Sequence, residues 1–266
     1  RALPDPGGTA SRLDFVSMAL NGAAFAALVV GAETLPARPA LAAVLFAAAV
    51  LGFAVLVRRE RSSKSPLLPL DLLRGAAFRV SVIASLCCFA GQAAGMVALP
   101  FYLQHGLGQT ALMTGLYITP WPLTVALAAP ITSRLANYVP TAWLCAAGGA
   151  CLAAGLAAVS LWPVHGDPRP LVPFIMLCGL GFGLFQVPNN RNLFLAAPRE
   201  RSGAAGGMQG TARLMGQTAG GVVLTLLFAL TTAAAAPRVG LGIGAVLALV
   251  AGVVSLGRGH RLRGVA

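Results

Sequence analysis

Eight stretches of this sequence, each about 18 to 30 residues long, carry almost no charged side chain. An α-helix rises about 1.5 Å per residue, so about 20 apolar residues cross a hydrocarbon layer roughly 30 Å thick. Because lipid offers no partner for backbone N–H and C=O groups, each stretch must be helical. The sequence therefore predicts an all-α polytopic membrane protein, with spans at 15–34, 40–57, 80–104, 114–133, 141–162, 171–190, 203–231 and 239–257.

Composition supports a membrane protein over a soluble one. Of the 266 residues, 57% are hydrophobic and only 10% are charged, whereas a soluble domain has about 25% charged residues. The core helices of a soluble protein give a few apolar runs of about 10 to 14 residues, which are shorter and fewer than those seen here.

The net charge of +12 raises the possibility of nucleic-acid binding, but the basic residues are distributed as in a membrane protein. A DNA-binding stripe would cluster on one soluble face. Here the segments on one side of the predicted spans hold most of the basic residues, and the other side holds only Arg38, Arg169 and Arg238. Basic loops stay in the cytoplasm. We therefore expect a cell-membrane protein with both ends cytoplasmic and with no nucleic-acid partner.

The N-terminal end has no features of a targeting signal. The chain opens with Arg1-Ala2-Leu3-Pro4 inside a Pro- and Gly-rich stretch, without an initiator Met, an n-region or a cleavage site. This pattern is typical of a chain that continues something longer, and we expect a C-terminal fragment. An even number of spans with both ends inside fits an appended half.

No metal, cofactor or enzyme motif is recognisable. The three histidines are isolated, and the sequence lacks a CxxC pair, a GxSxG elbow, an HExxH motif and a phosphate loop. Without a phosphate loop the chain cannot itself be an ATP-driven pump. The Gly-rich run at 179–183 has a GxGxG register in the middle of a span, which favours close helix packing over dinucleotide binding. The five cysteines lie within spans and are expected to be small buried side chains: Cys87, Cys88, Cys145, Cys151 and Cys178.

One predicted span is rich in proline. Pro120, Pro122 and Pro130 each remove a helix hydrogen bond and bend the chain. Two interpretations are open: a kinked helix supported by its neighbours, or a helix bent around a cavity with Tyr117 and Trp121 one turn apart on one face.

The span at 203–231 carries the only charged side chain expected deep in the membrane. Arg213 lies on one stripe with Gly206, Gly210, Gln217 and Gly220, and Gln209, Arg213 and Gln217 are spaced i, i+4 and i+8. A guanidinium there costs about 2.5–3.5 kcal/mol on insertion scales. None of the seven acids lies deep in a span, so its partner is a backbone carbonyl, a glutamine, an anion or a residue of a missing half. We favour carbonyls and a structural role over contact with a substrate; snorkelling to the surface is the further alternative.

The residues divide into four segments. We expect an N-terminal tail with two spans at 1–57, a basic cytoplasmic loop at 58–79, six further spans at 80–257 and a basic cytoplasmic tail at 258–266. Within the loop, the leucines and flanking charges of 66–74 predict a segment lying in the membrane interface. This loop is the expected domain boundary.

Several motifs resemble the fourteen-helix drug:H+ antiporter family of the major facilitator superfamily. They lie at 99–104, 106–108, 115–116, 199–203 and 210–216, and at 129–137, which is similar to the family's cytoplasmic loop between paired helices. In that loop, Ser133 and Asn137 stand where the family pattern has Gly and Asp, so the gating contacts attributed to it are in doubt. The resemblance covers roughly residues 14–255. It implies two linker helices and the C-terminal six-helix domain, with six N-terminal helices missing.

The resemblance also implies a function. Such proteins exchange protons for amphipathic, often cationic drugs by alternating access between two halves, and the carboxylates credited with proton coupling belong mostly to the absent half. Expected partners are lipid, a small amphipathic substrate, protons and that missing half. By analogy the substrate cavity would involve Gln92, Met96, Tyr117, Trp121, Phe182, Gln186, Gln209, Arg213 and Gln217. Packing and kinks would involve Pro120, Pro122, Pro130, Gly206, Gly210, Gly216 and Gly220. The alternatives are an exporter of one dedicated metabolite and a truncated, non-transporting membrane protein.

Overall fold

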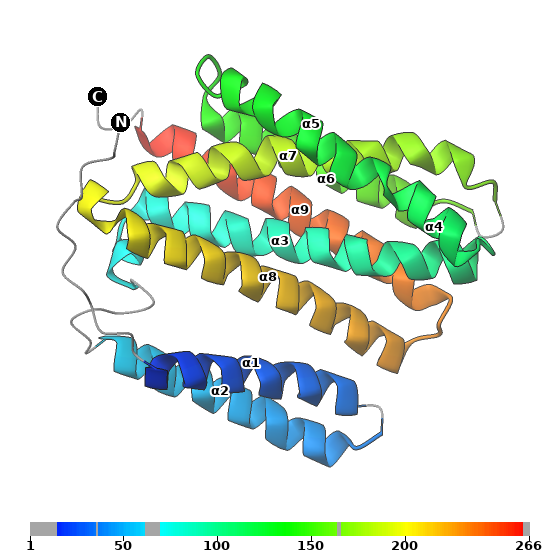
Figure 1. Cartoon of the computed structure of the whole chain (residues 1–266), viewed down its shortest axis with the longest axis horizontal. Helices are drawn as coiled ribbons and strands as arrows, with labels where there is room; N and C mark the ends of the chain where they lie inside the picture. The colour runs from blue at the N-terminus through cyan, green and yellow to red at the C-terminus, as the bar shows by residue number, and fades with distance from the viewer. Residues whose placement is uncertain (1–14, 36, 62–69, 164–165, 263–266) are drawn as a thin grey trace, which may run out of the picture. The chain divides into compact units, whose positions relative to one another are not determined.

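The computed structural model describes residues 15–35, 37–61, 70–163 and 166–262 (Figure 1). Within these residues all regular structure is helical, and eight helical segments are long and apolar enough to cross a membrane. The all-α polytopic fold is therefore confirmed. The α-helices are α1 Phe15–Thr34, α2 Pro39–Arg61, α3 Ala76–Phe101, α4 Ala111–Ile118, α5 Pro120–Leu135, α6 Thr141–Ser160, α7 Val172–Leu195, α8 Ser202–Leu230 and α9 Ala235–Leu262, with α4 and α5 together forming one crossing. Short turns of other helix types cover Leu70–Arg74, Tyr102–Gly106, Arg169–Leu171 and Arg199–Arg201.

The chain forms two compact units, Arg1–Leu70 and Asp71–Ala266, and their boundary falls inside the 58–79 segment. Residues 66–69 of the expected interfacial segment at 66–74 lie outside the described residues; the rest, Leu70–Arg74, is a 3-10 turn. The first unit is a hairpin of α1 and α2. Phe25 and Phe53 meet edge to face at 5.1 Å in this hairpin.

The second unit holds six membrane crossings arranged as an arc. In order of packing, α5 contacts α7, α7 contacts α6, α6 contacts α9, α9 contacts α3, and α3 contacts α8. Figure 1 shows α5 and α8 at opposite edges of this unit. Across the arc, α3 and α7 also touch. Because α5 and α8 are the two ends of the arc, each packs along one side mainly on a single neighbour.

Glycines let the inner helices of the arc approach closely. A Cβ added at Gly148 of α6 would lie 2.6 Å from the carbonyl oxygen of Gly181 in α7. A Cβ at Gly149 would lie 2.7 Å from the carbonyl oxygen of Ala248 in α9. The expected packing role of the glycine run at 179–183 is confirmed, since added Cβ atoms there would collide with α5 or α6.

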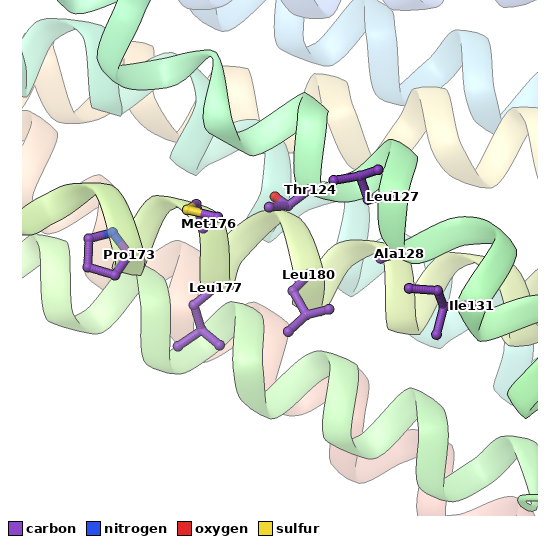
Figure 2. Close-up of a pocket in the computed structure, with 8 residues that line it drawn as sticks. All are labelled: Thr124, Leu127, Ala128, Ile131, Pro173, Met176, Leu177 and Leu180. Atoms are coloured by element: carbon purple, nitrogen blue, oxygen red, sulfur yellow. The ribbon is translucent and has the colours of Figure 1, made fainter.

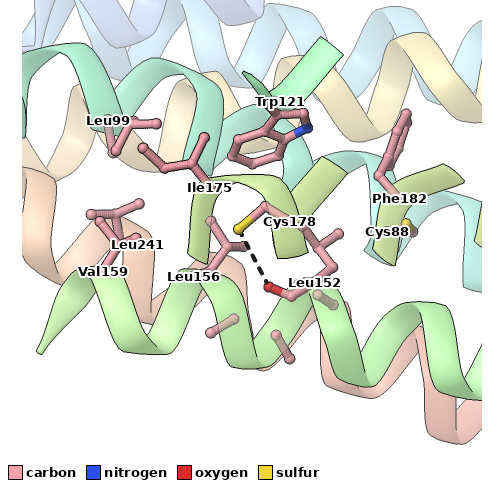
Figure 3. Close-up of a cluster of buried hydrophobic side chains, with 14 of the residues drawn as sticks. Cys88, Leu99, Trp121, Leu152, Leu156, Val159, Ile175, Cys178, Phe182 and Leu241 are labelled. Atoms are coloured by element: carbon pink, nitrogen blue, oxygen red, sulfur yellow. Dashed lines mark hydrogen bonds between the residues drawn. The ribbon is translucent and has the colours of Figure 1, made fainter. Parts of the chain in front are cut away.

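The buried core lies among these inner helices (Figure 3). Cys178 points at the carbonyl oxygen of Leu152, with sulfur and oxygen 4.0 Å apart, and the Trp121 ring lies in the same cluster. Of the five cysteines, Cys88, Cys145 and Cys178 are buried as expected. Cys87 and Cys151 are instead half-buried, with Cys87 packed against the core cluster.

The proline-rich crossing is two helices. α4 ends at Ile118 and α5 begins at Pro120, so Thr119 separates them. The Thr124 hydroxyl donates to the carbonyl oxygens of Pro120 (2.8 Å) and Trp121 (2.9 Å), which supports the first turn of α5. Thr119 keeps helical backbone angles (φ −51°, ψ −37°), so the prolines interrupt the hydrogen-bond ladder within one crossing, and Pro130 lies further along within α5.

Side chains fasten both ends of the second unit. At one end, the Tyr102 hydroxyl donates to the carbonyl oxygen of Trp162 at 2.8 Å, and Arg238 Nε donates to that of Ser160 at 2.9 Å. These bonds tie the ends of α3 and α9 to the end of α6.

At the other end, Arg191 of α7 donates to the Ala136 carbonyl oxygen at 3.1 Å and to Asn137 Oδ1 at 2.9 Å. These two acceptors follow α5. Asp71 and Arg201 form an ion pair that joins the segment before α3 to the segment before α8. In that pair the guanidinium lowers the pKa of the Asp71 carboxyl.

Candidate functional site

Polar side chains inside the spans gather on α7 and α8. Gln186 and Asn190 are four residues apart on α7, and Gln209, Arg213 and Gln217 follow the same spacing on α8. Residues spaced by four lie on one helix face. Gln209 Nε2 lies 3.4 Å from Asn190 Oδ1, so the two faces meet. We call these five residues the polar strip.

The Arg213 side chain lies on an aromatic ring of α3. Its guanidinium carbon is 5.6 Å from the centre of the Phe89 ring, within the range of a cation–π contact. Phe89 in turn meets Phe182 of α7 edge to face at 5.5 Å. Phe89 is 2% exposed, whereas Arg213 is exposed. One buried ring therefore joins α3, α7 and the charge on α8.

A buried amide fixes α7 against α3 beside this ring. Asn189 Nδ2 donates to Ser85 Oγ at 2.7 Å and to the carbonyl oxygen of Ser81 at 3.2 Å. Further along α3, Gln92 Oε1 is buried and accepts no hydrogen bond from the described residues. Polar groups thus continue from the strip into the contact between α3 and α7.

The predicted cavity residues do not all lie together. Phe182 and Arg213 are joined through Phe89, and Gln209 meets α7. Trp121 is only 2% exposed and lies in the core, where its ring faces Gly95. The remaining members, Gln92, Met96, Tyr117, Gln186 and Gln217, are half-buried.

The predicted packing glycines of α8 differ from one another. Added Cβ atoms at Gly216 and Gly220 would collide with α3, and one at Gly206 would lie 3.6 Å from the Phe194 ring. At Gly210 an added Cβ meets no heavy atom within 4 Å, so this residue contacts no neighbouring helix among the described residues.

Sequence reasoning missed five members of this region, three on α3 and two on α7. Ser81, Ser85 and Phe89 of α3 are spaced by four and form a stripe, and Asn189 and Asn190 are adjacent polar residues in a charge-free span. Both signals were present. Neither showed that the stripe on α3 meets α7.

A separate apolar groove of about 360 Å³ lies between α5 and α7 (Figure 2). The hydroxyl of Thr124, the one polar side chain lining it, bonds to its own helix. The groove therefore offers no polar group for recognition. Its lining residues are Thr124, Leu127, Ala128, Ile131, Pro173, Met176, Leu177 and Leu180.

Comparison with known families decides what this helical unit is. The family model described as Major Facilitator Superfamily matches residues 15–221, most of the chain. The chain belongs to the major facilitator superfamily. It is 42% identical over 232 residues to the uncharacterized transporter YebQ of Escherichia coli, covering 85% of this chain and 50% of that protein.

Two other relatives have names that refer to drugs. The multidrug resistance protein Stp of Mycobacterium tuberculosis is 31% identical over 66% of the chain and 33% of that protein. The tetracenomycin C resistance and export protein of Streptomyces glaucescens is 27% identical over 69% of the chain and 34% of that protein. The chain thus spans half or less of the length of these relatives.

Proposed function

We propose that this chain is the C-terminal part of a proton-coupled transporter that exports amphipathic drugs by alternating access. Membership of the superfamily supports transport, and the names of Stp and the tetracenomycin protein support efflux. In this proposal α1 and α2 are linker helices, and the unit from Asp71 onward is the C-terminal domain.

The observation that carries the proposal is the exposed Arg213 within a membrane crossing. A guanidinium in hydrocarbon costs about 2.5–3.5 kcal/mol on insertion scales, so such a side chain faces protein or water. Within the unit that begins at Asp71, Arg213 is exposed. The polar strip therefore fits a surface that faces a second domain across a solvated pathway.

Proton coupling requires a group that exchanges protons. The seven acids of the sequence lie near the ends of spans or outside them. In this proposal the coupling carboxylates belong to an N-terminal half, which is also the main protein partner of this unit. Lipid surrounds the rest.

The function is tested with the complete gene product in everted membrane vesicles. We expect an imposed proton gradient to drive uptake of several chemically unrelated amphipathic dyes, and a protonophore to abolish it. Uptake of a single compound would instead support a dedicated metabolite exporter. No proton-dependent uptake across a broad panel would overturn the proposal.

We further propose a cell-membrane location with both ends of the chain in the cytoplasm, because the basic residues concentrate on that side. Single cysteines at positions 106–108 and 166–168 should react with an impermeant thiol reagent added to whole cells. Cysteines at positions 62–64 should react only after permeabilisation. The reverse pattern would contradict this orientation.

A further inference from the structure

The charge of the polar strip is positive. Arg213 lies about three turns into α8, well inside the crossing. Of the acids, Glu33 is at the end of α1, Asp71 precedes α3 and Asp167 precedes α7, and the other four lie outside the spans or beside basic residues at their ends. The strip consequently contains a cation and four amides, with no carboxylate among the described residues.

The guanidinium of Arg213 has unused hydrogen-bonding capacity. Arginine carries five N–H donors in a planar fork. Among the described residues it has one contact, the face of the Phe89 ring. A cation–π contact engages the guanidinium without using its N–H groups as hydrogen-bond donors, so these remain available to an acceptor. The backbone carbonyl expected from the sequence as the partner of Arg213 is therefore not seen among the described residues, and the Phe89 ring takes its place.

The position of Phe89 keeps these donors in place. Its ring is buried and meets Phe182 edge to face, and Gly216 brings α8 close to α3 beside it. A fixed planar fork is suited to a carboxylate or another delocalised oxyanion, which it binds through two parallel hydrogen bonds. Gln209 and Gln217, one turn to either side, add neutral donors and acceptors.

We propose that the polar strip recognises organic anions, with Arg213 binding their carboxylate, phenolate or enolate oxygens. This inference rests on the proposed transport function and names the charge class of its substrate. An organic cation near the strip meets a like charge in a medium of low dielectric constant, which disfavours it. The unit thereby selects against the cationic drugs that the family resemblance implies.

The competing explanation is an acidic side chain of another part of the full-length protein that neutralises Arg213. The two explanations differ in how substitution affects ligands of opposite charge. Loss of a substrate-binding charge weakens the binding of anions alone. Loss of a structural ion pair leaves an unpaired carboxylate and weakens the binding of anions and cations together.

The test uses two dyes with the same xanthene ring system, the anion fluorescein and the cation rhodamine 123. Binding to the purified full-length protein is followed by fluorescence anisotropy. We expect the wild type to bind fluorescein more tightly. A charge-assisted hydrogen bond supports a loss of about tenfold or more in fluorescein affinity for Arg213→Gln, with rhodamine 123 binding unchanged or improved.

Two further variants serve as controls. Arg213→Lys keeps the charge but loses the fork, so fluorescein affinity should lie between those of the wild type and Arg213→Gln. Arg169→Gln removes the same charge outside α7, and both affinities should match the wild type.

Tighter wild-type binding of rhodamine 123 than of fluorescein would overturn the inference, whether or not the variants fold. An equal loss of affinity for both dyes in Arg213→Gln would also overturn the inference. Uptake into everted vesicles separates the two proposals. Arg213-dependent fluorescein binding without proton-driven uptake would support the inference and overturn the transport function, whereas proton-driven uptake of rhodamine 123 alone would do the reverse.

Discussion

Helices α6 and α8 are both apolar membrane crossings, yet they are packed very differently. In the most apolar 18-residue window of α6, 56% of the residues are buried, against 17% for α8. α6 has glycines facing α7 and α9, whereas α8 rests on α3 along one stripe. Hydrophobicity alone thus identifies a membrane crossing, whereas the role of the helix depends on the face that is turned away from its first neighbour. On α6 this face packs on another helix, and on α8 it carries Arg213.

The largest effect should come from filling the α6 interface. Gly148→Leu places a side chain where even a Cβ would lie 2.6 Å from backbone atoms of α7, so the helices must separate. We expect a loss of about 3 kcal/mol or more in unfolding free energy. The measurement is the melting temperature of the full-length protein in detergent, with unfolding monitored by size-exclusion chromatography.

Gly210→Leu on α8 is the matched control, because a Cβ there meets nothing within 4 Å. Its melting temperature should stay close to that of the wild type. Equal destabilisation by the two substitutions would contradict the difference in packing between α6 and α8 at these positions.

A smaller effect is expected at the ring beneath Arg213. Phe89→Leu keeps most of the buried volume and should cost about 1.5 kcal/mol or less. Because the ring positions the guanidinium, Phe89→Leu should also weaken fluorescein binding, and its effect should overlap with that of Arg213→Gln. In a double-mutant cycle we expect a coupling of about 0.5–1 kcal/mol. Strictly additive losses would show that the cation–π contact does not position the charge.

The buried amide between α3 and α7 should contribute less. Ser85→Ala removes the acceptor 2.7 Å from Asn189 Nδ2. Hydrogen bonds between membrane helices average about 0.6 kcal/mol, with a maximum near 1.7 kcal/mol. Denaturant titration in mixed micelles can detect a change of this size, with Ser133→Ala, on an exposed position of α5, as the control. A gain in stability would contradict the structural role of this bond.

The smallest effect concerns pH. Arg201 lowers the pKa of Asp71 below the ordinary carboxyl value of 3.8, so the ion pair stabilises the folded state above that pH. The stabilisation is lost as pH falls from this value through the lowered native pKa. Because the pair is partly exposed, it contributes less than about 1 kcal/mol.

Thermal unfolding between neutral and acidic pH tests this prediction by comparing the wild type with Asp71→Asn. We expect the two melting curves to converge in acid. A difference that persists below the native pKa would mean that another property of residue 71 is responsible.

Much of the fold follows from the sequence because the thickness of a membrane fixes helix length. All eight predicted spans occur. Their ends shift where polar residues extend a helix beyond the apolar stretch, as at Arg58 and Arg59 of α2. Arg213 could also be found from the sequence, since a lone charge in an apolar crossing is conspicuous.

The partners of that charge could not be predicted. Helical spacing tells which residues share a face, but not which neighbour covers it. Tyr117 and Trp121 are one turn apart, but their spacing did not show that Trp121 is buried in the core, with Tyr117 packed against the same cluster. Likewise Ser85 and Asn189 are 104 residues apart in sequence, and only the fold brings them together.

The side-chain bonds at both ends of the second unit have a mechanical consequence. Tyr102 and Arg238 anchor one end, and Arg191 and the Asp71–Arg201 pair anchor the other. A helix anchored at both ends resists sliding lengthwise past its neighbours. Any large displacement of this unit should therefore be a rotation as a rigid body, with Arg213 carried along as a fixed point on its surface.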